Sequence, residues 1–298
     1  MQLTTYGRSS GFQVDPIEKK PLNHFLPGSR VLSFGTAGCN LGCQFCQNWS
    51  ISKSRETDRL TEEAAPEEIA SAAIDRGCPS VAFTYNDPVI FAEYAVDTAA
   101  ACRRAGVRSV AVTAGYVTAE ARPWLFSAFD AANVDLKAFA PEFYRSTCLA
   151  GKGGLADVKE TLVWLKHESD VWFEITTLLI PGLNDSDAEI ARESDWIRDR
   201  LGTDVPVHFT AYHPDFKLID RPPTPPATVR RARDIARGRG LSFVYTGNIH
   251  DPEGQTTYCP ECREAVVTRD RYTILDLHLD DHGACARCRT PIPGRWFA

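Results

Sequence analysis

Short, continuously hydrophobic runs alternate with longer helix-like stretches between about residues 30 and 250. The runs are rich in β-branched and aromatic residues, which is typical of parallel strands that are covered by helices. Seven strands are predicted in this way: 30–36, 80–85, 107–113, 131–139, 171–180, 205–212 and 241–247. Repeated βα units predict an α/β protein, built as a parallel barrel or as an open, doubly wound sheet.

Several helix boundaries can be predicted between these runs. Pro66 is followed by two glutamates, so a helix is expected to begin there. Ser186 is expected to open a later helix, and Thr224–Pro225 to cap and begin the last barrel helix. Gly106 stands where a helix is expected to end.

The pattern changes after Gly254 to a short, loop-rich segment that is too small to have a core of its own. We therefore divide the chain into an N-terminal extension (1–29), a barrel (30–254) and a C-terminal segment (255–298).

Composition and charge narrow the class of protein. The chain has 298 residues, of which 43% are hydrophobic and 24% charged, as in ordinary globular proteins. Its 33 Lys and Arg against 39 Asp and Glu give a net charge of −6, which provides no general attraction to nucleic acid. No hydrophobic run reaches the roughly 18–20 residues of a membrane helix, and the N-terminus lacks the features of a signal peptide. We expect a cytoplasmic protein with no membrane or nucleic-acid partner.

Ten cysteines in such a chain indicate metal binding or catalysis, because disulfides are rare in a reducing compartment. They fall into three groups by spacing. Cys78, Cys102 and Cys148 are scattered and are expected to be core residues, with a substrate contact considered for Cys148 alone.

Cys259, Cys262, Cys285 and Cys288 form two C-x2-C pairs that are separated by 22 residues. Two such knuckles provide four thiolates for a tetrahedral Zn²⁺ ion, and a segment without a core of its own needs a bound metal ion to stabilise its fold. A zinc-ribbon-like appendage is therefore predicted. A second iron–sulfur centre is the alternative, and His282 is a substitute ligand that lies outside the knuckles.

Cys39, Cys43 and Cys46 form a C-x3-C-x2-C loop directly after the first predicted strand. Three thiolates can hold three irons of a cubane [4Fe–4S] cluster and leave the fourth iron open to another ligand. The alternative is a zinc or ferredoxin-type site that borrows a distant fourth cysteine.

This loop, with Phe45 before its last cysteine, resembles the C-x3-C-x-aromatic-C motif of the radical S-adenosylmethionine (SAM) superfamily. Further blocks are similar to the radical enzyme of the AmmeMemoRadiSam system, a group close to the pyruvate formate-lyase activases. They are DPIEKKPLNHFLPGS, FTYNDPVIFAEY, VDLKAF, IPGLNDS and AYHPDF. The resemblance covers roughly residues 14–260 and implies a partial (βα)6 TIM-like barrel with a [4Fe–4S] cluster and SAM as cofactors.

The resemblance also implies an activity. The reduced cluster would cleave SAM to give a 5′-deoxyadenosyl radical, which abstracts hydrogen from an unidentified substrate in an oxygen-sensitive reaction. The implied partners are an electron donor such as flavodoxin or ferredoxin, and Memo-like and AMMECR-type proteins of the same pathway. Two alternatives are a glycyl-radical-enzyme activase that acts on a protein glycine and a non-catalytic metal-binding interaction module. The intact cysteine loop argues against the second.

The same resemblance implies residues that contact SAM, in addition to Phe45 at the cluster. Asn86 and Asp87 stand where the superfamily has a Gly-Gly-Glu motif, from which this chain departs by a shorter carboxylate and by side chains in place of glycines. Asp135 and Lys137 match an Asp-Leu-Lys block near SAM, and His213 matches a histidine near the SAM carboxylate or ribose. The alternatives are a strand-end turn, a structural ion pair and a core histidine, respectively.

Other side chains also follow predicted strands at the face that is expected to carry chemistry. Tyr116, Asn248 and His250 are candidates for substrate contact, with a structural role as the alternative for each. Tyr116, His250 and His213 are the candidates for a catalytic role.

Overall fold

The computed structural model describes residues 3–53 and 62–297. Residues 1–2 and 298 of the two predicted terminal segments, and residues 54–61 of the predicted barrel, therefore lie outside the described residues.

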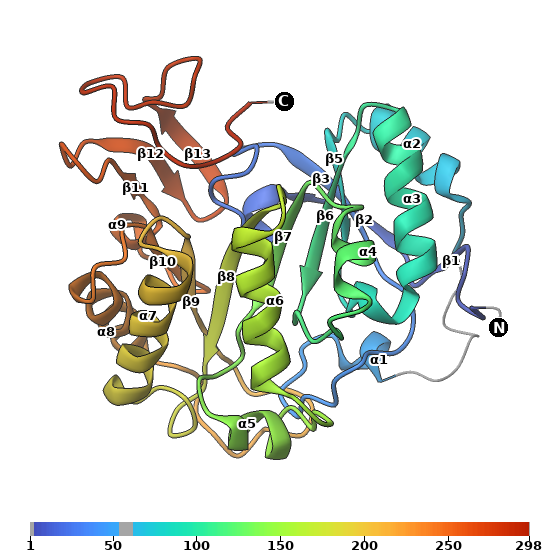
Figure 1. Cartoon of the computed structure of the whole chain (residues 1–298), viewed down its shortest axis with the longest axis horizontal. Coiled ribbons are helices and arrows are strands. Elements are labelled where there is room, and N and C mark those ends of the chain that lie inside the picture. The colour runs from blue at the N-terminus through green and yellow to red at the C-terminus, as the bar shows by residue number, and fades with distance from the viewer. Residues whose placement is uncertain (1–2, 54–61, 298) are drawn as a thin grey trace.

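The described residues form an eight-stranded sheet with the order β10-β9-β8-β7-β6-β5-β3-β2 (Figure 1). Seven of its strands are parallel: β3 (Arg30–Phe34), β5 (Ser80–Phe83), β6 (Arg108–Thr113), β7 (Ala131–Asp135), β8 (Trp172–Leu179), β9 (Val207–Ala211) and β10 (Val244–Gly247). Each lies within one of the seven predicted runs. The predicted α/β class with a parallel sheet is thus confirmed.

The eighth strand, β2 (Phe12–Pro16), was not predicted from the sequence. It pairs antiparallel with β3, so that Phe12 stands opposite Phe34. The segment alternates apolar and polar residues and ends in proline, as suits an edge strand with one face covered.

The helices are α1 (Trp49–Ser52), α2 (Pro66–Asp75), α3 (Ala92–Arg104), α4 (Arg122–Phe126), α5 (Pro141–Ser146), α6 (Leu155–His167), α7 (Asp187–Leu201), α8 (Pro226–Gly238) and α9 (Pro252–Gln255). Short 3-10 turns occupy Ile17–Lys19 and Pro88–Phe91. None of the helices in the described part of the chain is long and apolar enough to cross a membrane.

The predicted helix boundaries mostly hold. Helix α2 begins at Pro66, and the Ser186 hydroxyl accepts the backbone N–H of Glu189 at 3.3 Å at the start of α7. Helix α8 begins one residue later than predicted, with Pro225 as its N-cap. Gly106 follows α3 with a φ of +73°, a conformation that glycine adopts without steric cost.

The main core lies between the sheet and the helices that cover its outer face (Figure 1). Phe34 and Phe83 of neighbouring strands pack with ring centroids 5.1 Å apart, and Tyr94 of α3 covers Phe34 at 5.8 Å. Burial of these large apolar surfaces fixes α3 against the outer face of the sheet.

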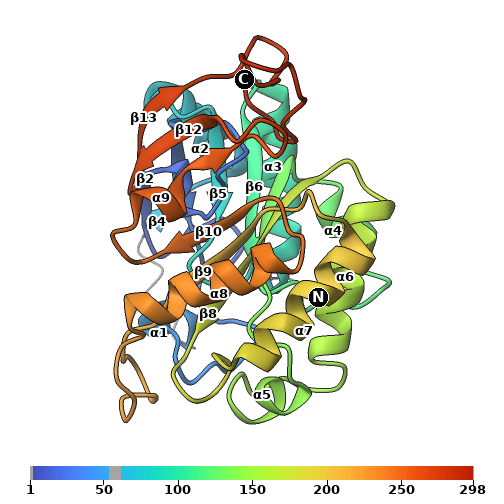
Figure 2. The ribbon, with the colours of Figure 1, turned by 90° about the vertical axis from the view of Figure 1, so that its left-hand side faces the viewer.

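The C-terminal segment forms a second, antiparallel sheet of β11 (Thr257–Tyr258), β12 (Ala265–Asp270) and β13 (Thr273–Leu277). This sheet lies beside β10 in both views (Figures 1 and 2). Its core is shared with the barrel, because Phe243 and Tyr245 pack in one buried cluster with Val266 and Trp296. A third sheet pairs β1 (Arg8–Ser9) with β4 (Glu62–Glu63).

Candidate functional site

The three loop cysteines line a cavity of about 300 Å³ at the carboxyl ends of the parallel strands. The loop follows β3, and the rest of the wall comes from the carboxyl ends of β5 to β10 together with Lys19 and Pro21. Of the residues predicted to bind cofactors, those that line this cavity are Cys39, Cys43, Cys46, Phe45, Asn86, Asp87, Asp135 and Lys137. Asn248 lines it as well.

The cysteine loop is fastened to the end of β5 by Asn86. The Asn86 side chain accepts the backbone N–H of Thr36 at 3.1 Å and donates to the carbonyl of Gly38 at 2.9 Å. Gly35 makes this close approach feasible, because a Cβ there would lie 2.3 Å from the carbonyl oxygen of Thr84. Asn86 therefore shapes the loop and also lines the cavity.

Asp87 ties the end of β5 to the end of β6. Its Oδ2 accepts the backbone N–H of Ala114 at 2.8 Å, and its Oδ1 accepts the Thr113 hydroxyl at 2.9 Å and the N–H of Val89 at 3.1 Å. Burial raises the pKa of Asp87, while these donors favour the charged form. Asp87 therefore stabilises the turn at the end of a strand, which was the alternative to SAM contact, and it also lines the cavity.

Asp135 and Lys137 form an ion pair at the end of β7, with Lys137 Nζ 2.5 Å from Asp135 Oδ2. Leu136 between them is fully buried, so the two charged side chains share the cavity face as strand alternation predicts. Burial disfavours the charge of Lys137, but Asp135 and the Cys43 thiol together outweigh it and raise the pKa of Lys137. A fixed positive charge thus faces the cysteines.

Cys148 contacts the cysteine loop at Gly42. Its side chain is fully buried, and its backbone carbonyl accepts the N–H of Gly42 at 2.9 Å. A hydrogen bond from Cys148 lowers the pKa of Cys43, although burial opposes this shift. Cys78 and Cys102 are buried in the core as predicted.

Phe45 packs beneath the loop. The side chain is buried, and its ring lies 5.8 Å from the ring of Phe143 in α5. The aromatic residue of the motif therefore anchors the loop to α5 while it borders the cavity.

The other predicted residues lie around the cavity. Asn248 adopts a φ of +59° and donates to the carbonyl of Ala211 at 3.0 Å. The Tyr116 hydroxyl donates to the carbonyl of Lys152 at 2.8 Å, and Tyr116 does not line the cavity as the described residues define it.

The two candidate histidines lie apart from the cysteines. His213 is exposed, with its ring nitrogens 3.3 Å from the side-chain amide nitrogen of Gln47. His250 is exposed and lies 3.3 Å from Asp270. Both border a neighbouring surface cavity that lies outside the cysteine-lined one.

Sequence reasoning missed two lysines in the cavity wall, Lys19 and Lys53. Lys53 Nζ donates to the carbonyl of Leu41 at 2.8 Å, and Lys19 Nζ lies 2.8 Å from Asp15. Lys19 lies in the DPIEKKP block, so the resemblance contained a signal for it, whereas Lys53 became recognisable only from the folded loop.

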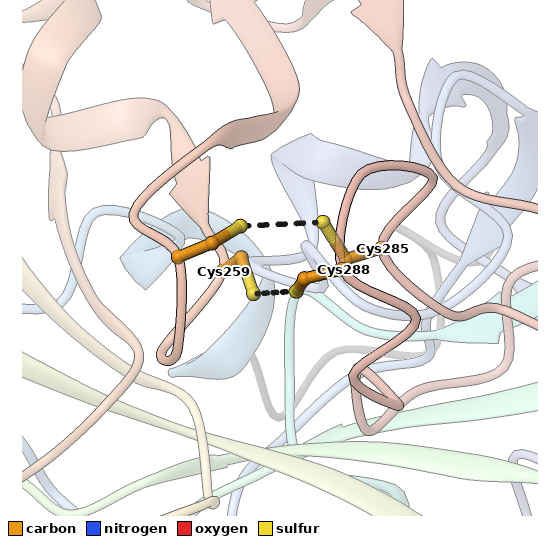
Figure 3. A group of neighbouring side chains, drawn as sticks. Cys259, Cys285 and Cys288 are labelled. Carbon is orange, nitrogen blue, oxygen red and sulfur yellow. Dashed lines mark hydrogen bonds between the residues drawn. The ribbon is translucent and has the colours of Figure 1, made fainter.

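The four C-terminal cysteines converge on one point (Figure 3). Their Sγ atoms all lie within 4.8 Å of one another, with 3.5 Å between Cys259 and Cys288 and 3.7 Å between Cys262 and Cys285. Four sulfurs at about 2.3 Å from a central Zn²⁺ ion would stand about 3.8 Å apart, so the residues fit a single tetrahedral metal ion. His282 is exposed and is not a member of this group.

The loop cysteines fit a different kind of centre. Cys39, Cys43 and Cys46 surround a cavity instead of closing on one point, and in the described part of the chain they form no single-ion group. A cubane cluster is larger than one ion and takes one thiolate at each of three corners. The donor set and the space between them therefore suit such a cluster.

Comparison with known proteins gives a consistent result. The family model described as the radical SAM superfamily matches residues 34–194. An uncharacterized protein of Methanocaldococcus jannaschii is 39% identical over 275 residues, which cover 92% of this chain and 80% of that protein. A pyruvate formate-lyase-activating enzyme of Clostridium pasteurianum is 24% identical over 200 residues, or 63% of this chain and 76% of that enzyme.

A solved structure is similar as well. The crystal structure of a radical SAM methyltransferase from Sphaerobacter thermophilus superposes with a TM-score of 0.57 at 18% identity, over 74% of this chain and 67% of that one. At this identity the match concerns the fold, and it confirms the predicted partial barrel.

Proposed function

Because the chain belongs to the radical SAM superfamily and is a radical SAM enzyme, we propose that Cys39, Cys43 and Cys46 hold the cluster and that SAM binds beside them. One observation carries this proposal: the three cysteines and the Asp135–Lys137 pair line a single cavity at the carboxyl ends of the strands. When both groups are bound, the cluster supplies the electron for reductive cleavage of SAM.

The chain's own residues would position SAM and balance its charge. Asp135 offers a carboxylate for the SAM ammonium, and Lys137 offers a cation for the SAM carboxylate and for the thiolates. Asn86 and Asp87 hold the cavity wall in place through their bonds to the loop and to β6. Phe45 excludes water from the side of the loop that faces α5.

We further assign the enzyme to the AmmeMemoRadiSam group, on the strength of the blocks shared with that group in the sequence. This assignment implies a cytoplasmic location and an electron donor such as flavodoxin or ferredoxin. It also implies Memo-like and AMMECR-type proteins as partners in the same pathway. The four C-terminal cysteines would hold Zn²⁺, for which the sulfur spacings of 3.5 and 3.7 Å are the support.

Activation of a glycyl-radical enzyme is the second candidate function, since the pyruvate formate-lyase-activating enzyme of Clostridium pasteurianum is a relative. An organic radical on the partner chain, detected by electron paramagnetic resonance, would support this function. Absence of that signal with glycyl-radical enzymes from the same source would count against it.

Anaerobic reconstitution tests the first proposal. The protein should bind about four irons at the loop and cleave SAM when reduced. Cys39→Ala should lose SAM cleavage and most of the iron while keeping the metal at the C-terminal cysteines. Unchanged cleavage by Cys39→Ala would show that the assignment of the loop is wrong.

A further inference from the structure

A second cavity, of about 370 Å³, lies beside the cysteine-lined one. The residues that line both cavities are Lys19, Pro21, Thr210 and Asn248. Its other wall is formed by the C-terminal segment through Arg269 of β12 and through Arg271 and Tyr272 at the turn between β12 and β13. The cavity thus extends from the cysteine-lined site to the segment that carries the four C-terminal cysteines.

Two buried polar atoms in this wall have no partner among the described residues. The Nε of Arg269 is one of them, although its Nη2 donates to the Asn23 carbonyl at 2.7 Å and the side chain is only 1% exposed. The Oε2 of Glu18 is the other, although Oε1 accepts the N–H of Gly28 at 2.7 Å and the residue is 5% exposed. Burial of such an atom is unfavourable unless a ligand or water satisfies it.

Arg271 adds an exposed positive charge to the wall. Its guanidinium has no ion pair within residues 3–53 and 62–297, whereas Lys19 of the same wall is paired with Asp15 at 2.8 Å. Arg271 also adopts a φ of +54°, a left-handed conformation that an arginine enters only at a cost. The Gln255 side chain holds this turn by accepting the Arg271 N–H at 3.0 Å.

We propose that this second cavity is the substrate site and that its substrate is a small organic anion, a carboxylate or a phosphate ester, with a hydroxyl or ammonium group nearby. The inference rests on the proposed function, because it places the substrate next to SAM. Arg271 binds the anionic group, the Arg269 Nε donates a further hydrogen bond, and Glu18 accepts from the donor of the substrate. The metal-binding segment thereby serves to hold two substrate-binding arginines against the barrel.

The test uses the full-length, reconstituted protein saturated with SAM. Inorganic phosphate and succinate are titrated separately by calorimetry in a buffer without other polyvalent anions, so that the stronger ligand shows whether the site prefers a phosphate or a carboxylate. Arg271→Gly removes the guanidinium and relieves the left-handed backbone, so it should fold at least as well as the parent chain. It should weaken binding of the preferred anion about tenfold or more.

Arg287→Gln is the matched control. Arg287 is an exposed arginine of the same segment, 2.8 Å from Glu264 and outside the wall of this cavity, so its removal should leave anion affinity unchanged. The proposal is overturned if the parent chain binds neither anion, if Arg271→Gly binds equally well, or if SAM abolishes the binding. SAM cleavage measured on the same preparation decides the proposed function separately, so cleavage without anion binding rejects the substrate assignment alone.

Discussion

Lys137 Nζ lies 2.5 Å from Asp135 Oδ2, and both side chains face the cavity that the three loop cysteines line. The pair retains some access to that cavity, with 16% of the Lys137 side chain and 31% of the Asp135 side chain exposed. Complete enclosure of an ion pair carries a desolvation cost that the mutual attraction does not always repay. The partial access leaves both charged groups able to contact a charged ligand in the cavity.

Asp135→Asn should distinguish a role in SAM binding from a structural role of the Asp135–Lys137 ion pair. We expect the folded protein and its iron content to be retained, while SAM affinity falls roughly tenfold because a charge-assisted hydrogen bond to the SAM ammonium is lost. Calorimetry on the reconstituted protein measures this. Asp204→Asn is the control, since it removes the carboxylate partner of another lysine, Lys166, which lies 3.0 Å away on the surface. A lower unfolding temperature with unchanged SAM affinity would instead assign Asp135 to closing the barrel.

Asp87 carries a prediction about stability. Its two oxygens together accept two backbone N–H groups and the Thr113 hydroxyl. Asp87→Asn replaces one oxygen with a donor and leaves at least one buried N–H unpaired, which costs about 1–3 kcal/mol. Urea denaturation of the parent chain and the variant should show this loss in the free energy of unfolding. Equal stability of the two proteins would mean that the hydrogen bonds to β6 are dispensable.

Much of the fold could be predicted because parallel strands that are buried on both faces leave a strong local pattern. All seven parallel strands appear within the predicted runs, and Ser186 caps α7 as its residue type indicates. The edge strand β2 could not be predicted, because its place depends on pairing with β3 and not on a hydrophobic run. Local patterns report burial, whereas the identity of a strand's neighbour is set by the whole chain.

The site divides in the same way. Strand alternation was sufficient to place Asp135 and Lys137 on one face, and the cysteine spacing was sufficient to predict a convergent C-terminal group. The wall that Arg269, Arg271 and Tyr272 contribute to the second cavity could not be predicted. Arg269 reaches the barrel only because β12 packs beside the segment that contains Asn23, a contact between residues that are 246 positions apart.

The C-terminal cysteines predict a metal dependence that differs from that of the loop. Cys262→Ser should lose bound zinc, measured by mass spectrometry of the metal, and should unfold at a lower temperature because the segment draws its stability from the metal. His282→Gln is the matched control, as His282 is exposed and outside the group of four sulfurs. About one zinc per chain should remain in this control. Iron in place of zinc in the parent chain would contradict the assignment.

His24 connects three parts of the molecule. Its Nε2 lies 2.5 Å from the Tyr245 hydroxyl of β10, and its Nδ1 lies 2.6 Å from the Pro293 carbonyl of the C-terminal segment. The Pro293 carbonyl can only accept, so Nδ1 carries the proton and Nε2 accepts from Tyr245 in the neutral ring. Protonation of Nε2 would require the Tyr245 hydroxyl to accept from the ring and to donate its own proton to Thr257 Oγ1, 2.8 Å away.

Acid should therefore destabilise the protein through His24. Burial lowers the pKa of His24 to about 4, against the attraction of Glu174, while an unfolded histidine titrates near 6.5. The contribution of neutral His24 to the free energy of unfolding is fully present above about pH 6.5. It is lost as the pH falls from there through about 4, which lowers the free energy of unfolding by about 3 kcal/mol. His24→Gln should be less stable at neutral pH and should show a shallower decline in the free energy of unfolding between pH 6.5 and 4. An equally steep decline in the variant would assign the acid sensitivity to other groups.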